Sequence, residues 1–167
     1  MPLVDYQIHS LCLQGMIDPF DEGLINPASL DVRVGDSIVV ETAAGFVLTD
    51  LTRYSEAEPY RIYPGEFLLM STLETFNMPD TIAGEFRLKS SRAREGFDQA
   101  LAIWCDPGWN GSKLTLEVRN NCRFHQLPIY PGRLIGQIIF HQCDRPLVSY
   151  RQKGRYNNDL VAQMSKG

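Results

Sequence analysis

The sequence predicts a mainly β domain, a barrel or sandwich built from many short strands. Short apolar or alternating runs recur along the chain, Pro-Gly pairs separate several of them, and only one amphipathic helix precedes them. A chain of 167 residues is expected to form a single domain that buries about two-thirds of its unfolded surface. We therefore expect residues 1–167 to fold around one β core.

The helix is expected at the N-terminus, with Asp5 as its cap and Gly15 near its end. The expected strands, in chain order, are 30–34, 37–40, 46–48, 67–71, 82–88, 100–104, 113–118, 127–130 and 134–141. Residues 49–58 form a polar insertion between strands. One further helical turn is expected from Ser90 to Glu95.

The overall charge argues against a general nucleic-acid partner. The chain has 16 basic and 20 acidic residues, a net charge of -4, whereas nucleic-acid binders are broadly basic. Cations gather locally in residues 87–94 and 151–155, where an anionic small molecule can bind. The N-terminus lacks the apolar core of a signal peptide, and no run approaches a membrane span. A cytoplasmic protein with no membrane partner is expected.

Glu117 is the strongest candidate for acid–base chemistry. The three apolar residues of the predicted strand 113–118 alternate with Thr115 and Glu117, so the carboxylate lies on the face opposite to them. Upstream, residues 89–94 read Lys-Ser-Ser-Arg-Ala-Arg, which brackets two hydroxyls with positive charge. That combination suits a triphosphate or a developing oxyanion.

These stretches resemble the dCTP deaminase branch of the dCTP deaminase/dUTPase superfamily. Its hallmarks are an Arg-Ser-Ser-x-x-Arg segment, here residues 89–94 with Lys89 in place of the first arginine, and an Asp-Pro-Gly-(aromatic)-x-Gly turn that leads to a Leu-Glu, here residues 106–117. Residues 17–35, 63–67 and 134–140 match further motifs, so the resemblance covers nearly the whole chain. It implies a distorted, dUTPase-like β-barrel of the β-clip type. It also implies a homotrimer with active sites between neighbouring subunits.

The same resemblance implies hydrolytic deamination of dCTP to dUTP and ammonia, a step that supplies dUMP and dTTP synthesis. Glu117 would move the protons, and Ser90 would hold the water or the base. Arg94 would position both of these side chains. Ala102 would offer its backbone carbonyl to the water.

The resemblance also implies a set of nucleotide-binding residues: Lys89, Ser91, Asp106, Thr115, Tyr150, Arg155 and Tyr156. Lys89 and Ser91 would contact the phosphates together with Arg155. Asp106 would accept a hydrogen bond from the sugar 3'-hydroxyl. Mg²⁺ is expected on the triphosphate, and no protein metal site is expected.

Zinc is not expected at the base. Zinc-dependent nucleobase deaminases need a His-x-Glu and a Pro-Cys-x-x-Cys, and this chain has neither. His141 and Cys143 alone do not make a metal site. The cysteines are scattered, so free thiols are expected at Cys12, Cys105, Cys122 and Cys143.

Residues 150–167 are expected to be a mobile lid over the triphosphate, because this tail lacks apolar periodicity and carries Gly154 among cations. The family's tail closes in this way. Its tail glutamine near the base has three candidate counterparts here, Asn158, Asp159 and Gln163.

Other functions stay open. The nearest alternative is a bifunctional enzyme that forms dUMP and pyrophosphate, in which Asp106 would also activate water for phosphoanhydride cleavage. A dUTPase is less favoured, because its glycine-rich C-terminal motif is absent and residues 106–111 replace its Asp-Tyr-Arg-Gly turn. A non-catalytic trimeric regulatory module would not need the intact Ser90, Arg94 and Glu117.

Overall fold

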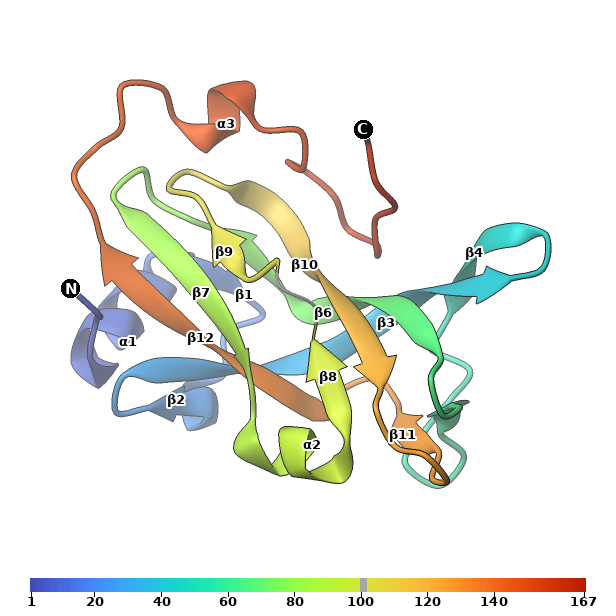
Figure 1. The fold of residues 1–167 in the computed structure, drawn as a ribbon. Coiled ribbons are helices and arrows are strands. Elements are labelled where there is room, and N and C mark those ends of the chain that lie inside the picture. The colour runs from blue at the N-terminus through green and yellow to red at the C-terminus, as the bar shows by residue number, and fades with distance from the viewer. Residues whose placement is uncertain (100–101) are drawn as a thin grey trace.

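The computed structural model describes residues 1–99 and 102–167. A ten-stranded sheet curls into a half-open barrel, with its strands in the order β8-β10-β6-β3-β12-β7-β9 (Figure 1). Three short strands join this path at its sides, since β1 pairs with β6, and both β2 and β4 pair with β3. β11 and β5 form a separate two-stranded sheet. The mainly β architecture predicted from the sequence is confirmed.

The elements, in chain order, are α1 (Asp5–Leu13), β1 (Ile17–Asp18), the 3-10 helix η1 (Glu22–Leu24), β2 (Ile25–Asn26), β3 (Ser29–Thr42), β4 (Gly45–Asp50), β5 (Tyr60–Ile62), β6 (Phe67–Asn77), β7 (Ile82–Leu88), α2 (Ser90–Glu95), β8 (Phe97–Gln99), β9 (Trp104–Cys105), β10 (Asn110–Asn120), β11 (Leu127–Ile129), β12 (Leu134–Gln142) and α3 (Tyr150–Lys153). Within the described part of the chain, every helix is too short or too polar to cross a membrane.

Two predicted strands, 30–34 and 37–40, are one strand in the structure. Gly35 lies where they join. The backbone passes very close to β6 at this point, and a Cβ on residue 35 would lie only 2.3 Å from the carbonyl oxygen of Thr72, so glycine is required there. Residues 100 and 101 of the predicted strand 100–104 lie outside the described residues, and the strand that follows is β9. β1, β2, β5 and β8 have only two or three residues, too few for alternation to show.

The first helix begins differently from the expectation. Val4, not Asp5, is the capping residue, and its backbone N–H donates to the Gln7 side-chain oxygen at 3.1 Å. Asp5 lies in the first turn, where a carboxylate interacts favourably with the helix dipole. Ile8 and Cys12, four residues apart on one face of the helix, are buried. The predicted turn at Ser90 to Glu95 is present as α2.

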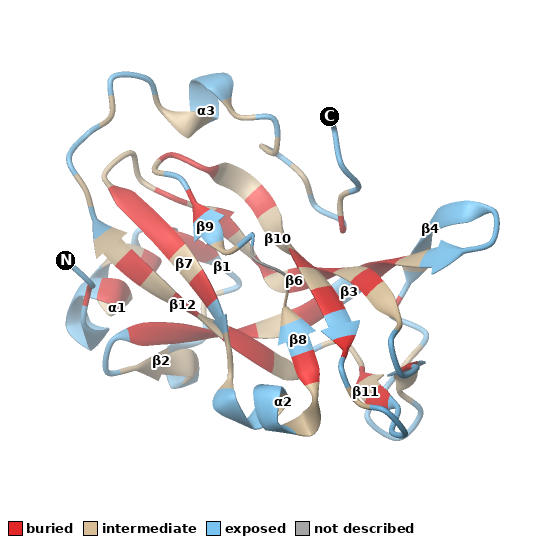
Figure 2. Ribbon diagram, viewed as in Figure 1, coloured by how far each residue is buried: buried red, intermediate tan, exposed pale blue. Residues whose placement is uncertain are grey.

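The core follows the centre of the sheet. Figure 2 shows nearly continuous burial along β3 but alternating burial along much of β10. β3 lies between β6 and β12, so hydrogen-bonded neighbours flank both of its edges, and it lies in the interior of the curled sheet. β10 keeps one face accessible, and that face is available for a site.

β6 is bulged at residues 72–74 against β10. On β10, Lys113 faces Thr75 but Thr115 faces Ser71, so the pairing jumps across this segment. The pairing with β3 shifts close by, where the extra residues lie on β3 between Val34 and Ile38. Because two extra residues lie on β6, the β10 side chains keep their faces, but from Thr115 onward they pair two positions farther along β6, so that Glu117 pairs with Leu69.

Buried polar groups hold the bulge. Glu74 is fully buried, and its carboxylate accepts from the backbone N–H of Arg33 at 2.9 Å and from the Nε of Arg33 at 2.7 Å. The Thr72 hydroxyl donates to the Glu74 carbonyl at 2.9 Å and accepts from the Leu114 N–H at 2.9 Å. The ion pair thus ties β3 to the bulge, and the hydroxyl ties the bulge to β10.

Arg33→Leu should lower the free energy of unfolding by about 3–5 kcal/mol, because it leaves the Glu74 charge buried without its partner. Urea denaturation at fixed protein concentration measures the change. Arg53→Leu is the matched control: its partner Asp50 lies 3.9 Å away, and both side chains are more than half exposed, at 82% and 53%. The control should shift stability by less than about 0.5 kcal/mol. Equal effects of the two substitutions would contradict the role of the buried pair.

Candidate active site

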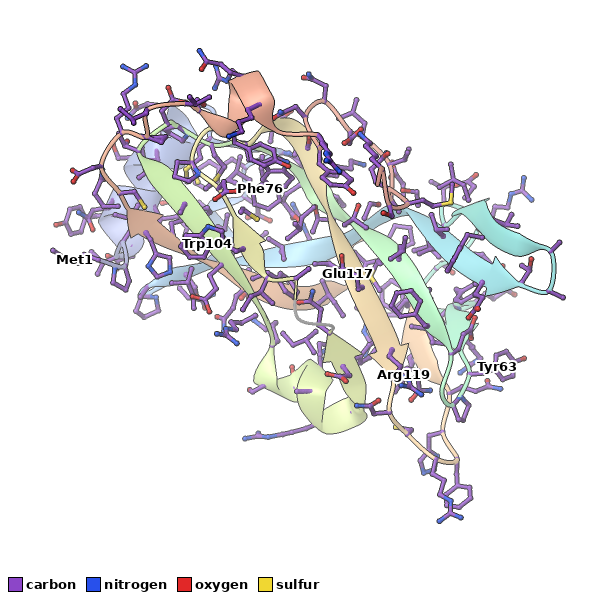
Figure 3. The ribbon with its side chains drawn as sticks, turned by 45° about the horizontal axis from the view of Figure 1, so that its top comes forward. Met1, Tyr63, Phe76, Trp104, Glu117 and Arg119 are labelled. Carbon is purple, nitrogen blue, oxygen red and sulfur yellow. The ribbon has the colours of Figure 1, made fainter. Side chains whose placement is uncertain are left out.

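A cavity of about 730 Å³ opens on the accessible face of β10 and runs under the C-terminal tail. Strands, the loop before β9 and the tail all contribute to its wall, which is formed by Phe46, Phe67, Leu69, Ala102, Trp104, Cys105, Asp106, Trp109, Lys113, Leu114, Thr115, Glu117, Tyr150, Tyr156, Asp159, Gln163, Met164 and Ser165. Figure 3 shows Glu117 on β10, with Trp104 on β9 to one side and Arg119 farther along β10.

Glu117 and Thr115 face the cavity together, as the strand alternation predicted. Leu116 and Val118 point the other way and are buried in the core. Leu114 departs from the prediction, because it faces the bulged part of β6 and lines the cavity too. The bulge therefore supplies an apolar wall next to the two polar side chains.

Burial raises the pKa of Glu117 above its usual value, although a hydrogen bond from Gln99 works in the opposite direction. That bond joins Gln99 Nε2 to Glu117 Oε2 at 3.3 Å. A carboxyl group with a raised pKa takes up a proton more readily than an ordinary carboxylate, which suits a group that must take a proton and then return it.

Asp106 is the second carboxylate of the cavity. It follows β9 directly, and its Oδ1 accepts from the indole N–H of Trp104 at 3.1 Å. Burial, assisted by the negative charge of Asp106, raises the pKa of the adjacent Cys105 thiol to about 12. Cys105 is therefore an inert thiol, and all four cysteines are free as predicted.

Aromatic side chains supply most of the remaining wall. Trp109, the aromatic residue of the Asp-Pro-Gly turn, stacks on Phe76 with ring centroids 5.2 Å apart. Its indole N–H donates to the backbone oxygen of Tyr156 at 2.6 Å and so links the turn to the tail. Tyr150 and Tyr156 both line the cavity from the tail. Flat apolar walls of this kind suit a planar base.

The tail lies along β10 and is held there through its backbone. The N–H groups of Asp159, Ala162 and Gln163 donate to the hydroxyls of Ser112, Ser37 and Thr115 at 3.1, 2.9 and 3.0 Å. Ala162 is buried, with 4% of its surface exposed. The tail therefore packs against the barrel more closely than its lack of apolar periodicity suggested.

Two of the three tail candidates reach the cavity. Asp159 and Gln163 line it, whereas Asn158 packs against Gly111, a glycine with a positive φ of 68°. The hydroxyl of Thr115 bonds the tail backbone. Its predicted contact with a nucleotide would have to replace or share that bond.

Five predicted site residues lie outside the cavity wall: Lys89, Ser90, Ser91, Arg94 and Arg155. The first four are at α2, which lies at the end of the molecule opposite α3 (Figure 1). Ser90, Ser91 and Arg94 are exposed there, and Lys89 forms an ion pair with Asp31. Within one chain, the hydroxyl and cation segment is therefore separated from Glu117.

The cavity of one chain is acidic. Asp106, Glu117 and Asp159 line it, and Lys113 is the one cation among the described lining residues. Lys113 is paired with Asp36 at 2.9 Å. A triphosphate needs several cations, so this wall alone does not provide a complete site for one.

Sequence reasoning missed several wall residues, notably Phe46, Lys113 and Trp104. Phe46 comes from the β3–β4 hairpin, far from the motifs along the chain. Trp104 carried one usable signal, its position two residues before Asp106. Among residues 1–99 and 102–167, no group of three or more His, Cys, Asp and Glu side chains is arranged to hold a metal ion.

Comparison with known proteins identifies the family. The family model described as dCTP deaminase-like matches residues 3–143. A protein of Methanosphaerula palustris named "dCTP deaminase, dUMP-forming" is 34% identical over 99% of this chain and 95% of its own length. A protein of Rhodococcus opacus with the same name is 38% identical over 73% of this chain and 69% of its own.

A solved structure supports the fold. The 2'-deoxycytidine 5'-triphosphate deaminase of Agrobacterium tumefaciens superposes with a TM-score of 0.69 at 20% identity. The match covers 84% of this chain, which spans 48% of that longer one.

Proposed function

Because this chain belongs to the dCTP deaminase-like family, we propose that it deaminates dCTP and then converts the product to dUMP and pyrophosphate. The names of the relatives favour dUMP as the end product, which the sequence analysis held as its alternative to dUTP. The observation that carries the proposal is Glu117, a partly buried carboxylate with a raised pKa in an aromatic-lined cavity.

In the deamination step, Glu117 takes a proton from water as the water oxygen bonds to C4 of cytosine. The carboxyl group delivers that proton to the ring nitrogen N3. It then moves the remaining hydroxyl proton to the amino group, the C4–N4 bond breaks, and ammonia leaves. The Ala102 carbonyl, which also lines the cavity, accepts a hydrogen bond from the attacking water.

In the second step, Asp106 activates another water for attack on the triphosphate. The bond between the α- and β-phosphates breaks, and dUMP and pyrophosphate form. One oxygen of Asp106 accepts from Trp104, so the other can face the water or the sugar 3'-hydroxyl. Two waters are consumed for each dCTP.

A second subunit completes the site in this proposal. The cavity is acidic within one chain, whereas Ser90 and Arg94 are exposed on α2, outside the wall of this cavity. In a homotrimer, α2 of a neighbour would bring its hydroxyl and guanidinium to the partner's Glu117. Lys89 and Ser91 would contact the phosphates, and Mg²⁺ would arrive on the triphosphate.

Residues 150–167 act as the lid in this proposal. Tyr150 and Tyr156 cover the base and sugar side of the cavity, and the exposed Arg155 turns towards the phosphates when nucleotide binds. The three hydroxyls that hold the tail backbone keep it over β10.

Incubation with dCTP and Mg²⁺ should yield dUMP, pyrophosphate and ammonia in equal amounts, measured by chromatography. Glu117→Gln should slow deamination by about 10²- to 10⁴-fold while dCTP still binds, because shape is kept and proton transfer is lost. Accumulation of dUTP as the end product would contradict the second step. Near-native turnover of Glu117→Gln would contradict the first.

Subunit mixing tests the shared site. Glu117→Gln and Arg94→Ala should each be inactive alone, yet trimers reassembled from an equal mixture should recover about one quarter of the wild-type activity. The reason is that a quarter of the interfaces then combine an intact Glu117 with an intact Arg94. If the mixed trimers stay inactive, Glu117 and Arg94 of the same subunit act together, and the shared site is contradicted.

Deletion of residues 150–167 should leave a folded barrel that needs far more dCTP for turnover. Arg155→Ala should show a milder rise in KM, about tenfold or more, because one charge-assisted hydrogen bond contributes about 1.5–3 kcal/mol. In hydrogen exchange, tail protection should rise with dCTP and Mg²⁺ and rise less with dCMP. Protection that is equal with and without nucleotide would refute the lid.

A further inference from the structure

Gln99 joins two polar groups at the cavity. It is the last residue of β8, and its Nε2 lies 3.3 Å from Glu117 Oε2 and 3.4 Å from the carbonyl oxygen of Ala102. Both partners are acceptors, and a carboxamide nitrogen carries two N–H groups, one for each. A single side chain therefore holds the carboxylate and the carbonyl close to each other.

The orientation of this amide follows from its partners. If the group were rotated by half a turn, Oε1 would face the ionised carboxylate and the carbonyl, and all three oxygens would repel one another. With Nε2 facing them, Oε1 is buried and has no hydrogen-bond partner among the described residues. An unpaired buried acceptor is unfavourable for stability, so a purely structural position would favour an apolar side chain. The unfavourable burial of Oε1 therefore indicates that the two hydrogen bonds of Nε2 have a functional role.

We propose that Gln99 is a positioning residue, which aims the Glu117 carboxylate and keeps the Ala102 carbonyl beside it so that both meet the same water. The inference deepens the proposed function and rests on it. Gln99 is absent from the cavity wall, so it acts through its two partners and not on the substrate. Its bond also favours the ionised form of Glu117, which opposes the effect of burial on the pKa.

Gln99→Met tests this, because methionine has a similar length but no N–H donor. We expect kcat for dCTP to fall about tenfold with little change in KM, since a hydrogen bond to a charged group is lost. The acid limb of the pH profile of kcat should move to higher pH, because the pKa of Glu117 rises when the donor is removed. Gln99→Glu, which keeps the shape and adds a second carboxylate, should move it farther in the same direction.

Asn121→Leu is the matched control. Asn121 donates to Asp98 at 3.0 Å, a carboxamide–carboxylate bond beside the same strand pair but outside the cavity wall. This variant should keep the wild-type kcat and pH profile. Thermal unfolding shows whether each of the three variants is folded. If Gln99→Met is not folded, Gln99→Glu tests the proposal in its place.

A direct titration separates this inference from the proposed function. Carbon NMR of the Glu117 carboxyl in the protein without nucleotide reports its pKa whether or not the residue is catalytic. A higher pKa in Gln99→Met supports the contact. An unchanged titration together with an unchanged kcat would overturn the positioning role. Undiminished turnover in Glu117→Gln would instead overturn the function of Glu117 itself.

Discussion

The site depends on the buried pair of Arg33 and Glu74. A fully buried carboxylate on a bulged segment is unfavourable unless charge and hydrogen bonds satisfy it, and Arg33 supplies both from β3. The bulge shifts the register of β6 against β10, and the period of a strand is two residues. Because the shift is two residues, Glu117 stays on the open face and pairs with Leu69, whereas an unshifted register would pair it with Ser71. The neighbours of Glu117 on the open face therefore depend on an ion pair that joins β6 to β3, on the opposite side of β6 from β10.

The cavity combines parts that are far apart along the chain. Glu117 and Thr115 come from β10, Ala102 and Asp106 flank β9, and the tail closes over them. Each part is fixed by its own contact, such as the bond from Trp109 to the Tyr156 backbone. The parts are also linked to one another, since Gln99 joins Glu117 to the Ala102 carbonyl and the Thr115 hydroxyl holds the tail.

Much of the fold and part of the site could be predicted from the sequence. Alternation along residues 113–118 correctly placed Thr115 and Glu117 on one face, since that pattern is local. The register shift, the capping of α1 by Val4 and the contribution of Phe46 could not be predicted, because each depends on partners distant in sequence or on competing side chains. The motif residues of α2 were recognisable as a group, but a single chain does not bring them to the cavity.

The way in which the tail is held has an evolutionary consequence. Hydroxyls of the barrel accept hydrogen bonds from backbone N–H groups of the tail, and every residue type except proline has such a group. Side chains along this segment can therefore vary through mutation while docking is preserved. Changes in ligand preference can thus be concentrated in a short stretch of the chain, and the barrel beneath it need not change.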